Sequence, residues 1–229
     1  MSEIAQQPSP NFDDRRFPVS MLVLHYTGMQ TGEAALERMC DPEASVSAHY
    51  MVWESGDIVQ LVDEDKRAWH AGVSRWQGEE ELNSRSIGIE IVNGGHDWRL
   101  EDGRLPPYPA DQIDAVIALS RDIIARWSIP QTRIVGHSDI APTRKQDPGE
   151  HFPWARLAGQ GVGLWPLSLE ASQRPSIDAA LQAIGYDTTD LGAAVTAFQR
   201  RWRPARVDGL VDADTRSIAF AVADLYLAS

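Results

Sequence analysis

Short apolar segments rich in isoleucine, leucine and valine recur in the first two thirds of the chain, with a long amphipathic segment among them. Residues 21–26 (MLVLHY) and 86–92 (SIGIEIV) have the composition of buried strands, and a shorter strand is predicted over 133–136. Over residues 110–127, apolar side chains recur at the spacing of a helix packed on one face. This part of the chain is therefore predicted to contain both strands and helices.

Shorter elements are predicted between these segments. Residues 49–53 and 58–62 are strand-like and flank Ser-Gly-Asp, so we expect a hairpin. A short helix is expected over 33–39. The first 20 residues contain three prolines and are expected to form a loose arm.

The chain changes character near its end. Glycine and proline interrupt residues 158–175, whereas three helical patterns follow at 176–184, 190–202 and 212–227. Asp214 and Thr215 are expected to cap the last helix. The predicted organisation is an N-terminal arm (1–20), a large α/β domain (21–166), a linker (167–175) and a small three-helix domain (176–229).

Composition excludes several classes of protein. The chain has 229 residues, of which 43% are hydrophobic and 24% charged, as in a folded protein. A net charge of −12 argues against a nucleic-acid partner, because phosphate contacts need a basic surface. No apolar run approaches the roughly 20 residues of a membrane span, and the single cysteine, Cys40, excludes an intrachain disulfide. No signal-like apolar segment precedes Arg16, so we expect a cytoplasmic protein, with a periplasmic or outer-membrane location as the alternative.

Candidate catalytic groups gather after two of the predicted strands. His25 ends the first strand, and His137, Lys145 and Asp147 lie in one proline-containing segment after a later strand. Two histidines and one carboxylate form a set that zinc favours, with a fourth position left for water. Spacing alone leaves the alternative open, since a histidine at a strand end is more often structural.

Long motifs around these residues resemble the zinc-dependent N-acetylmuramoyl-L-alanine amidases of the AmpD and AmiD type. They are LVLHYTG, SVSAHYMVWESGDIVQLVDEDKRAWHAGVS, NSRSIGIEIVN and RIVGHSDIAPTRKQDPGEHFPW. The resemblance spans about residues 18–166 and implies an α/β fold in which helices flank a mixed β-sheet. It also implies one zinc ion per chain, held by His25, His137 and Asp147, with Glu90 and Lys145 as catalytic residues.

The implied reaction cleaves the amide bond between muramic acid and L-alanine of the peptidoglycan stem peptide. Glu90 is expected to act as general base on a zinc-activated water, and Lys145 to stabilise the oxyanion. The alternative for Glu90 is an ion pair with an arginine such as Arg85. Tyr26, Trp69 and His70 are the expected substrate contacts, although His70 is equally consistent with a group that orients a metal ligand.

Other residues are assigned structural positions. We expect His49 to be a structural hydrogen-bonding residue, His96 and His151 to lie at the surface, and Cys40 to be buried. The segments LQAIGY, AVTAFQRRW and VDGLVDADTRSIA near the C-terminus resemble a three-helix peptidoglycan-binding module. A helical appendage that only packs on the catalytic domain is the alternative.

The leading function is that of a recycling amidase acting on anhydromuramyl-peptides or other peptidoglycan fragments. An envelope or phage amidase acting on intact sacculi and a non-catalytic peptidoglycan receptor are the alternatives. The oligomeric state is left open. Deleting residues 172–229 is expected to spare cleavage of soluble fragments.

Overall fold

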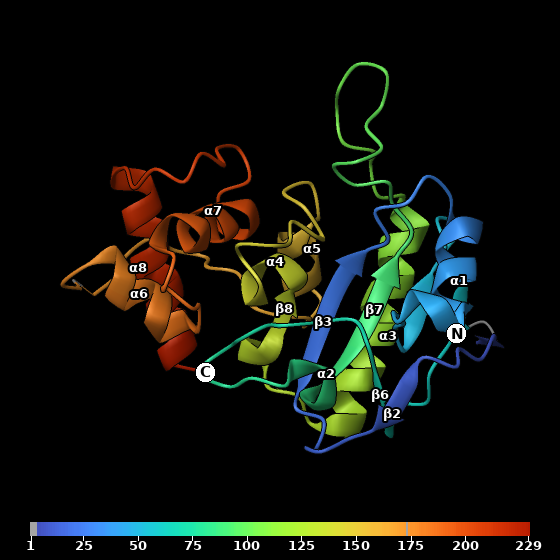
Figure 1. The fold of residues 1–229 in the computed structure, drawn as a ribbon. Coiled ribbons are helices and arrows are strands. Elements are labelled where there is room, and N and C mark those ends of the chain that lie inside the picture. Colours follow the sequence, from blue (N-terminus) through green and yellow to red (C-terminus); the bar gives the residue numbers. More distant parts are fainter. Residues whose placement is uncertain (1–3, 173) are drawn as a thin grey trace.

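A computed structural model describes residues 4–172 and 174–229, and its centre is a six-stranded mixed sheet (Figure 1). The central strands are parallel to one another, whereas β4 and β5 form the expected antiparallel hairpin. In spatial order the strands are β1 (Ala5–Gln6), β5 (Ile58–Gln60), β4 (Tyr50–Val52), β7 (Ser86–Ile91), β3 (Met21–Tyr26) and β8 (Ile134–Gly136).

Strands β3 and β7 form the centre of the sheet and are paired along their whole length, from Met21 opposite Ser86 to Tyr26 opposite Ile91. In this register His25 lies directly opposite Glu90. Paired positions on neighbouring strands point to the same face of a sheet. The sheet therefore brings a candidate metal ligand and the candidate general base to one face, near its carboxyl edge.

Helix α3 (Ala110–Trp127) has the bounds that the periodicity predicted, and it covers the other face of the sheet (Figure 1). Its side chains Ile113, Val116 and Ile123 are buried against apolar residues of the central strands. Burial of an aliphatic side chain of this size stabilises the fold by about 1.5–3 kcal/mol. The other helices of this part are short: α1 (Gly32–Cys40), α2 (Leu82–Arg85), α4 (His137–Ile140) and α5 (Trp154–Ala158).

The N-terminal segment differs from the expected loose arm. Residues Ala5–Gln6 pair with β5, and β2 (Phe12–Asp14) pairs antiparallel with β6 (Lys66–Ala68). These pairings give the backbone N–H and C=O groups of the segment hydrogen-bond partners on distant strands. The local sequence, with its three prolines, contains no sign of those partners, so it suggested a loose arm. Cys40, expected to be buried, is only half-buried at the end of α1.

The three C-terminal helices form as predicted: α6 (Ile177–Ile184), α7 (Leu191–Trp202) and α8 (Ala213–Leu227). Asp212, rather than Asp214 or Thr215, caps α8, because its side chain accepts the Thr215 backbone N–H. None of the helices in the described residues is both long and apolar enough to cross a membrane.

The C-terminal helices lie on the side of the molecule where β8 and α4 are found (Figure 1). They share one apolar core with the neighbouring part of the sheet. Trp76 is fully buried, and its ring lies 5.0 Å from that of Tyr186 and 6.4 Å from that of Tyr226. Val135 of β8 and Ile140 of α4 belong to the same cluster. The helices are therefore packed on the sheet through buried apolar contacts.

His49 has the structural role that its sequence context predicted. It is fully buried, its Nδ1 accepts the Gly88 backbone N–H at 2.9 Å, and its Nε2 lies 3.1 Å from the carbonyl of Lys66. Burial, followed by the charge of Arg15, lowers the pKa of His49 to about 3. The folded protein therefore holds this imidazole neutral.

This lowered pKa predicts a loss of stability in acid. The unfolded chain takes up the proton as the pH falls below about 6.5, whereas the folded chain does not, so the free energy of unfolding falls between about pH 6.5 and pH 3. His49 alone is expected to remove about 3 kcal/mol by pH 4, at about 1.4 kcal/mol per pH unit. Urea unfolding of the metal-free protein at pH 7 and pH 4 measures the total loss, to which other buried histidines such as His25 also contribute. His49→Asn, which keeps an acceptor near Gly88, is expected to show a shallower pH dependence, and an unchanged dependence would contradict the assignment.

Candidate metal centre

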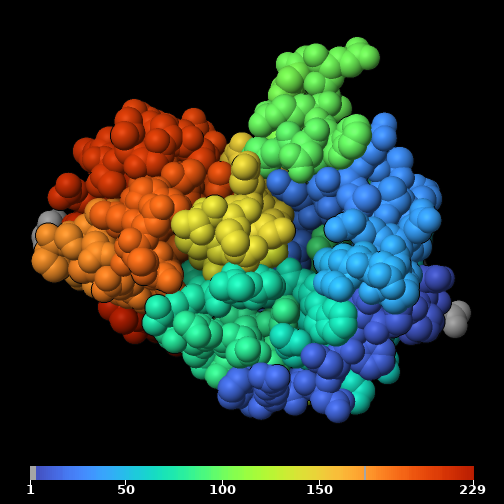
Figure 2. Space-filling view, in the orientation of Figure 1, coloured from blue at the N-terminus to red at the C-terminus, as the bar shows by residue number. Residues whose placement is uncertain are grey.

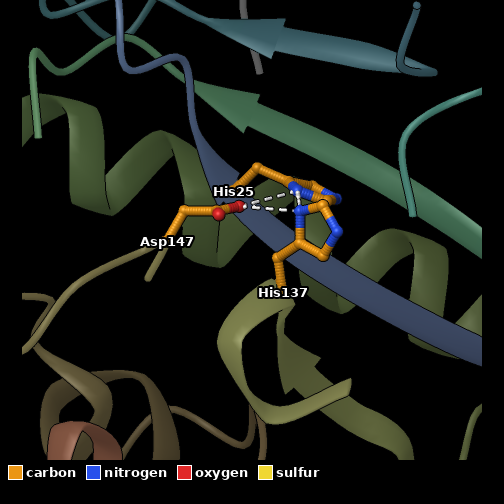
Figure 3. Close-up of side chains that lie close together, drawn as sticks. All are labelled: His25, His137 and Asp147. Carbon is orange, nitrogen blue, oxygen red and sulfur yellow. Dashed lines mark hydrogen bonds and ion pairs between the residues drawn. The ribbon is translucent and has the colours of Figure 1, made fainter. Parts of the chain in front are cut away.

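Three side chains from separate segments converge at the carboxyl edge of the sheet (Figure 3). His25 lies near the end of β3, His137 is the first residue of α4 after β8, and Asp147 lies in the loop that follows. His25 Nδ1 is 2.9 Å from both His137 Nδ1 and Asp147 Oδ2, and His137 Nδ1 is 3.1 Å from the same oxygen. All three residues are buried.

Hydrogen bonds on the far side of His25 determine which of its nitrogens faces the cluster. Ser86 Oγ donates to the Leu82 carbonyl at 2.6 Å, so it accepts from His70 Nε2 at 3.2 Å. His70 Nδ1 then accepts from His25 Nε2 at 3.0 Å. His25 Nδ1 therefore carries a lone pair that points into the cluster.

His137 is oriented in the same sense, because its Nε2 donates to the Ala71 carbonyl at 3.0 Å. The glycine at position 88 makes room for this arrangement, since a Cβ there would lie 2.6 Å from the His70 ring. His70 contacts His25 in the way expected of an orienting group, and it also lines the metal cavity, so its contact with substrate stays a prediction. This pattern, in which a ligand donates its other N–H to a fixed acceptor, is common around protein-bound metals.

The donor set fits a metal ion. Two imidazole lone pairs and a carboxylate oxygen face one another at about hydrogen-bond distance, an arrangement that needs a cation or a proton between them. Burial and the neighbouring His137 lower the pKa of His25 to about 4, so this imidazole is neutral near pH 7. Burial opposes ionisation of Asp147, but His137 and His25 outweigh it and lower its pKa.

Glu90 lies beside this cluster without a partner of its own. Its Oε2 is buried and accepts no hydrogen bond from the described residues. Burial and the charge of Asp147 raise the pKa of Glu90 well above its usual value, while Lys145 opposes the shift. The alternative partner, Arg85, instead lies 3.4 Å from Glu79, so the ion-pair interpretation of Glu90 is wrong.

Glu90, Lys145 and the metal-site residues His137 and Asp147 line one cavity of about 430 Å³. Figure 2 shows a recess between the segment near residue 145 and the segment of residues 25–50, beneath a projecting loop. Glu90 and Lys145 therefore face the same space as His137 and Asp147, and their catalytic roles stay predictions.

The rim of the cavity contains residues that the sequence analysis placed at the surface. Tyr26 donates from its hydroxyl to His96 Nδ1 at 2.9 Å, and His96 Nε2 donates to Glu150 at 3.0 Å. His96 is only 12% exposed, and His151 stacks on Tyr108 with ring centroids 4.8 Å apart. Both histidines are half-buried, so the surface prediction holds only in part.

A usable signal for these residues was present in the sequence. His96 follows β7, and the carboxyl ends of the parallel strands β3 and β7 meet at the same edge of the sheet. Glu150 and His151 follow Asp147 closely in the chain. Tyr26 lines the cavity as expected, whereas Trp69 is absent from the lining residues, and its substrate contact stays a prediction.

A buried His-His-Asp set beside an unpaired carboxylate is typical of metal-dependent hydrolases. The family model described as N-acetylmuramoyl-L-alanine amidase matches residues 15–150. The chain is 38% identical over 235 residues to the N-acetylmuramoyl-L-alanine amidase AmiD of Escherichia coli, covering 91% of this chain and 83% of that protein. It is also 38% identical over 169 residues to the 1,6-anhydro-N-acetylmuramyl-L-alanine amidase AmpD of Enterobacter cloacae, covering 66% of this chain and 86% of AmpD. The chain belongs to the N-acetylmuramoyl-L-alanine amidase family.

Solved structures agree with this assignment over nearly the whole chain. AmiD from E. coli, in a complex with the substrate anhydro-N-acetylmuramic acid-L-Ala-D-gamma-Glu-L-Lys, matches with a TM-score of 0.80 and 36% identity, covering 98% of this chain and 93% of AmiD. AmpDH3 from Pseudomonas aeruginosa matches with a TM-score of 0.81 and 32% identity, covering 96% of each chain. The mixed sheet flanked by helices is therefore the fold of these amidases, as predicted.

Proposed function

We propose that this amidase holds one zinc ion through His25, His137 and Asp147 and cleaves the bond between muramic acid and L-alanine in peptidoglycan fragments. The observation that carries the proposal is the convergence of the two Nδ1 atoms and the Asp147 carboxylate beside the unpaired Glu90. Two histidines and one carboxylate, with a further position left open, form a common catalytic zinc set. A complete ligand set disfavours a non-catalytic receptor.

Each residue has a role that its surroundings support. Zinc held by these three side chains would supply the Lewis acidity that attack of water on an amide needs at neutral pH. Glu90 takes the proton of the attacking water and passes it to the departing amine of L-alanine, and its raised pKa suits a group that both accepts and returns a proton. The Lys145 ammonium stabilises the oxyanion that forms on the carbonyl oxygen.

The proposed substrate is a soluble anhydromuramyl-peptide, which places the enzyme in cell-wall recycling. The AmiD structure is a complex with such a substrate, and the AmpD relative is named as an anhydro-muramyl amidase. The C-terminal segments resemble a peptidoglycan-binding module, and this resemblance makes intact sacculi a second candidate substrate. The cytoplasmic location stays a prediction.

Mass spectrometry of reaction products tests the proposal. Zinc-loaded protein is offered anhydromuramyl-tripeptide and intact sacculi in parallel, and we expect free tripeptide from the soluble substrate. His137→Ala, which removes one of three ligands, is expected to lose stoichiometric zinc and all measurable release. Release from sacculi at a similar rate would instead indicate a wall-degrading amidase. Bound zinc without release from either substrate would overturn the enzymatic role.

A further inference from the structure

The C-terminal helices contact the short helix that carries His137. Helix α4 begins at His137, and its third residue, Asp139, is buried with 1% of its side chain exposed. Two residues from the C-terminal part of the chain reach this carboxylate: Tyr186 from the loop between α6 and α7, and Arg201 from α7. Tyr186 donates from its hydroxyl to Asp139 Oδ1 at 2.6 Å, and Arg201 of α7 donates to Oδ2 at 2.8 Å.

We propose that Arg201 and Tyr186 are positioning residues for the metal centre, so that the C-terminal helices complete the zinc site instead of serving only as an attached module. Both act through Asp139 on the turn that presents His137. The inference rests on the proposed metal site. It states that the metal affinity of this site depends on residues outside the segment 15–150 that matches the amidase family.

The hydrogen bonds of α4 connect Asp139 to two of the three ligands. Asp139 Oδ2 accepts the backbone N–H of Gly136 at 2.9 Å, which caps the turn immediately before His137. The backbone N–H of Ser138, between His137 and Asp139, donates to the carbonyl of Asp147 at 2.8 Å. A shift of α4 therefore moves the imidazole of His137 and the backbone of Asp147 together.

Arg201 is held so that it cannot follow such a shift easily. Its side chain is 1% exposed, it donates through a second nitrogen to the Ile134 carbonyl of β8 at 3.1 Å, and its guanidinium lies 4.0 Å from the centroid of the Trp154 ring. The planar guanidinium therefore joins β8, α4 and α5 at one point. Burial and Asp139 raise the pKa of Tyr186 well above its usual value, which keeps the phenol protonated as a donor.

A second contact from α7 reaches the other side of the metal cavity. Arg200 Nε lies 3.6 Å from Glu150, the carboxylate that accepts from His96 at the cavity rim. Two consecutive residues of α7 thus contact the site from different sides: Arg201 contacts Asp139 in the turn that carries His137, and Arg200 contacts Glu150, the partner of His96. This placement is expected of a helix that supports the site rather than one that binds a remote ligand.

Metal affinity tests the proposal with three variants. Arg201→Met removes the ion pair and keeps apolar volume, and Tyr186→Phe removes a single hydrogen bond. Arg203→Met is the matched control. Arg203 lies two residues further on, and within the described part of the chain its side chain bonds only to Asp212, Asp214 and Thr215, near the start of α8. Zinc dissociation constants are measured by competition with a chelator, the visible spectrum of the cobalt-substituted protein reports the ligand geometry, and urea unfolding reports stability.

We expect Arg201→Met to bind zinc about 10–100-fold more weakly and to change the cobalt spectrum, as when an outer partner of a metal ligand is removed. Tyr186→Phe is expected to change the zinc affinity and the cobalt spectrum in the same direction, but by less. If Arg201→Met does not fold, Tyr186→Phe provides the test of the positioning role. Arg203→Met is expected to keep the wild-type zinc affinity and the wild-type cobalt spectrum. Wild-type zinc affinity and cobalt spectra in Arg201→Met or, if that variant does not fold, in Tyr186→Phe would overturn the positioning role. A wild-type protein that binds no zinc would overturn the proposed metal site itself.

Discussion

A Glu90→Gln variant is expected to lose roughly 10²–10⁴-fold in kcat, the usual contribution of a general base, while it keeps its zinc. The amide has the shape of the carboxylate but cannot take a proton from the attacking water. Because Glu90 Oε2 has no hydrogen-bond partner in the described structure, the substitution breaks no existing contact there. It also removes a buried carboxyl whose ionisation is disfavoured, so the free energy of unfolding is expected to stay equal or rise.

Three measurements check this prediction on the same preparation: zinc content, the urea unfolding midpoint, and kcat on anhydromuramyl-tripeptide at saturating zinc. Glu54→Gln is a matched control, because Glu54 is exposed and lies in the hairpin turn between β4 and β5. The control is expected to retain wild-type values in all three. Turnover by Glu90→Gln within about threefold of wild type would remove Glu90 from the proton transfer.

Removal of residues 172–229 is expected to prevent the rest of the chain from folding stably, which reverses the expectation from sequence that cleavage of soluble fragments survives. The deletion exposes Trp76 and Ile140, which are buried in the core shared with the C-terminal helices. It also leaves the carboxylate of Asp139 without Arg201 and Tyr186.

The size of the loss follows from these contacts. Each large apolar side chain contributes about 1.5–3 kcal/mol through burial, and breaking a buried ion pair costs about 3–5 kcal/mol. With several apolar residues affected, the sum is comparable to the whole stability of a typical domain, about 5–15 kcal/mol. From sequence, the C-terminal helices were expected to be dispensable because the glycine- and proline-rich segment before them is typical of a linker. Such a segment does not indicate whether the parts on either side of it pack together.

Expression of residues 1–171 tests this expectation through soluble yield, the cooperativity of urea unfolding, and release of tripeptide. A chain that ends at residue 226 is the control, because it removes only three exposed residues, the first of which, Leu227, is 67% exposed. The control is expected to behave as the full chain. A 1–171 fragment with the full chain's unfolding midpoint and activity would show that the C-terminal helices are dispensable. Binding of those helices to polymeric wall stays a separate prediction.

The sequence by itself determined features that depend on neighbours along the chain. The repeat of apolar residues in α3 and the apolar runs of β3 and β7 are local patterns, and they predicted these elements nearly to the residue. The motifs around His25, His137 and Asp147 identified the residues that the structure brings together. A motif retains the residue types that a reaction needs, so these residues were found before any contact was known.

Only the tertiary structure decided the contacts that support the site. The register that places Glu90 opposite His25, the hydrogen bond from His25 to His70, and the link from Arg201 to Asp139 join residues far apart in the chain. The positions of His96 and of the N-terminal strands depend in the same way on distant partners. Burial and pairing are properties of the assembled sheet and its helices, so local spacing carries little information about them. The physical reason is that local conformation follows from adjacent residues, whereas the surroundings of each polar group are set by whatever the fold packs against it.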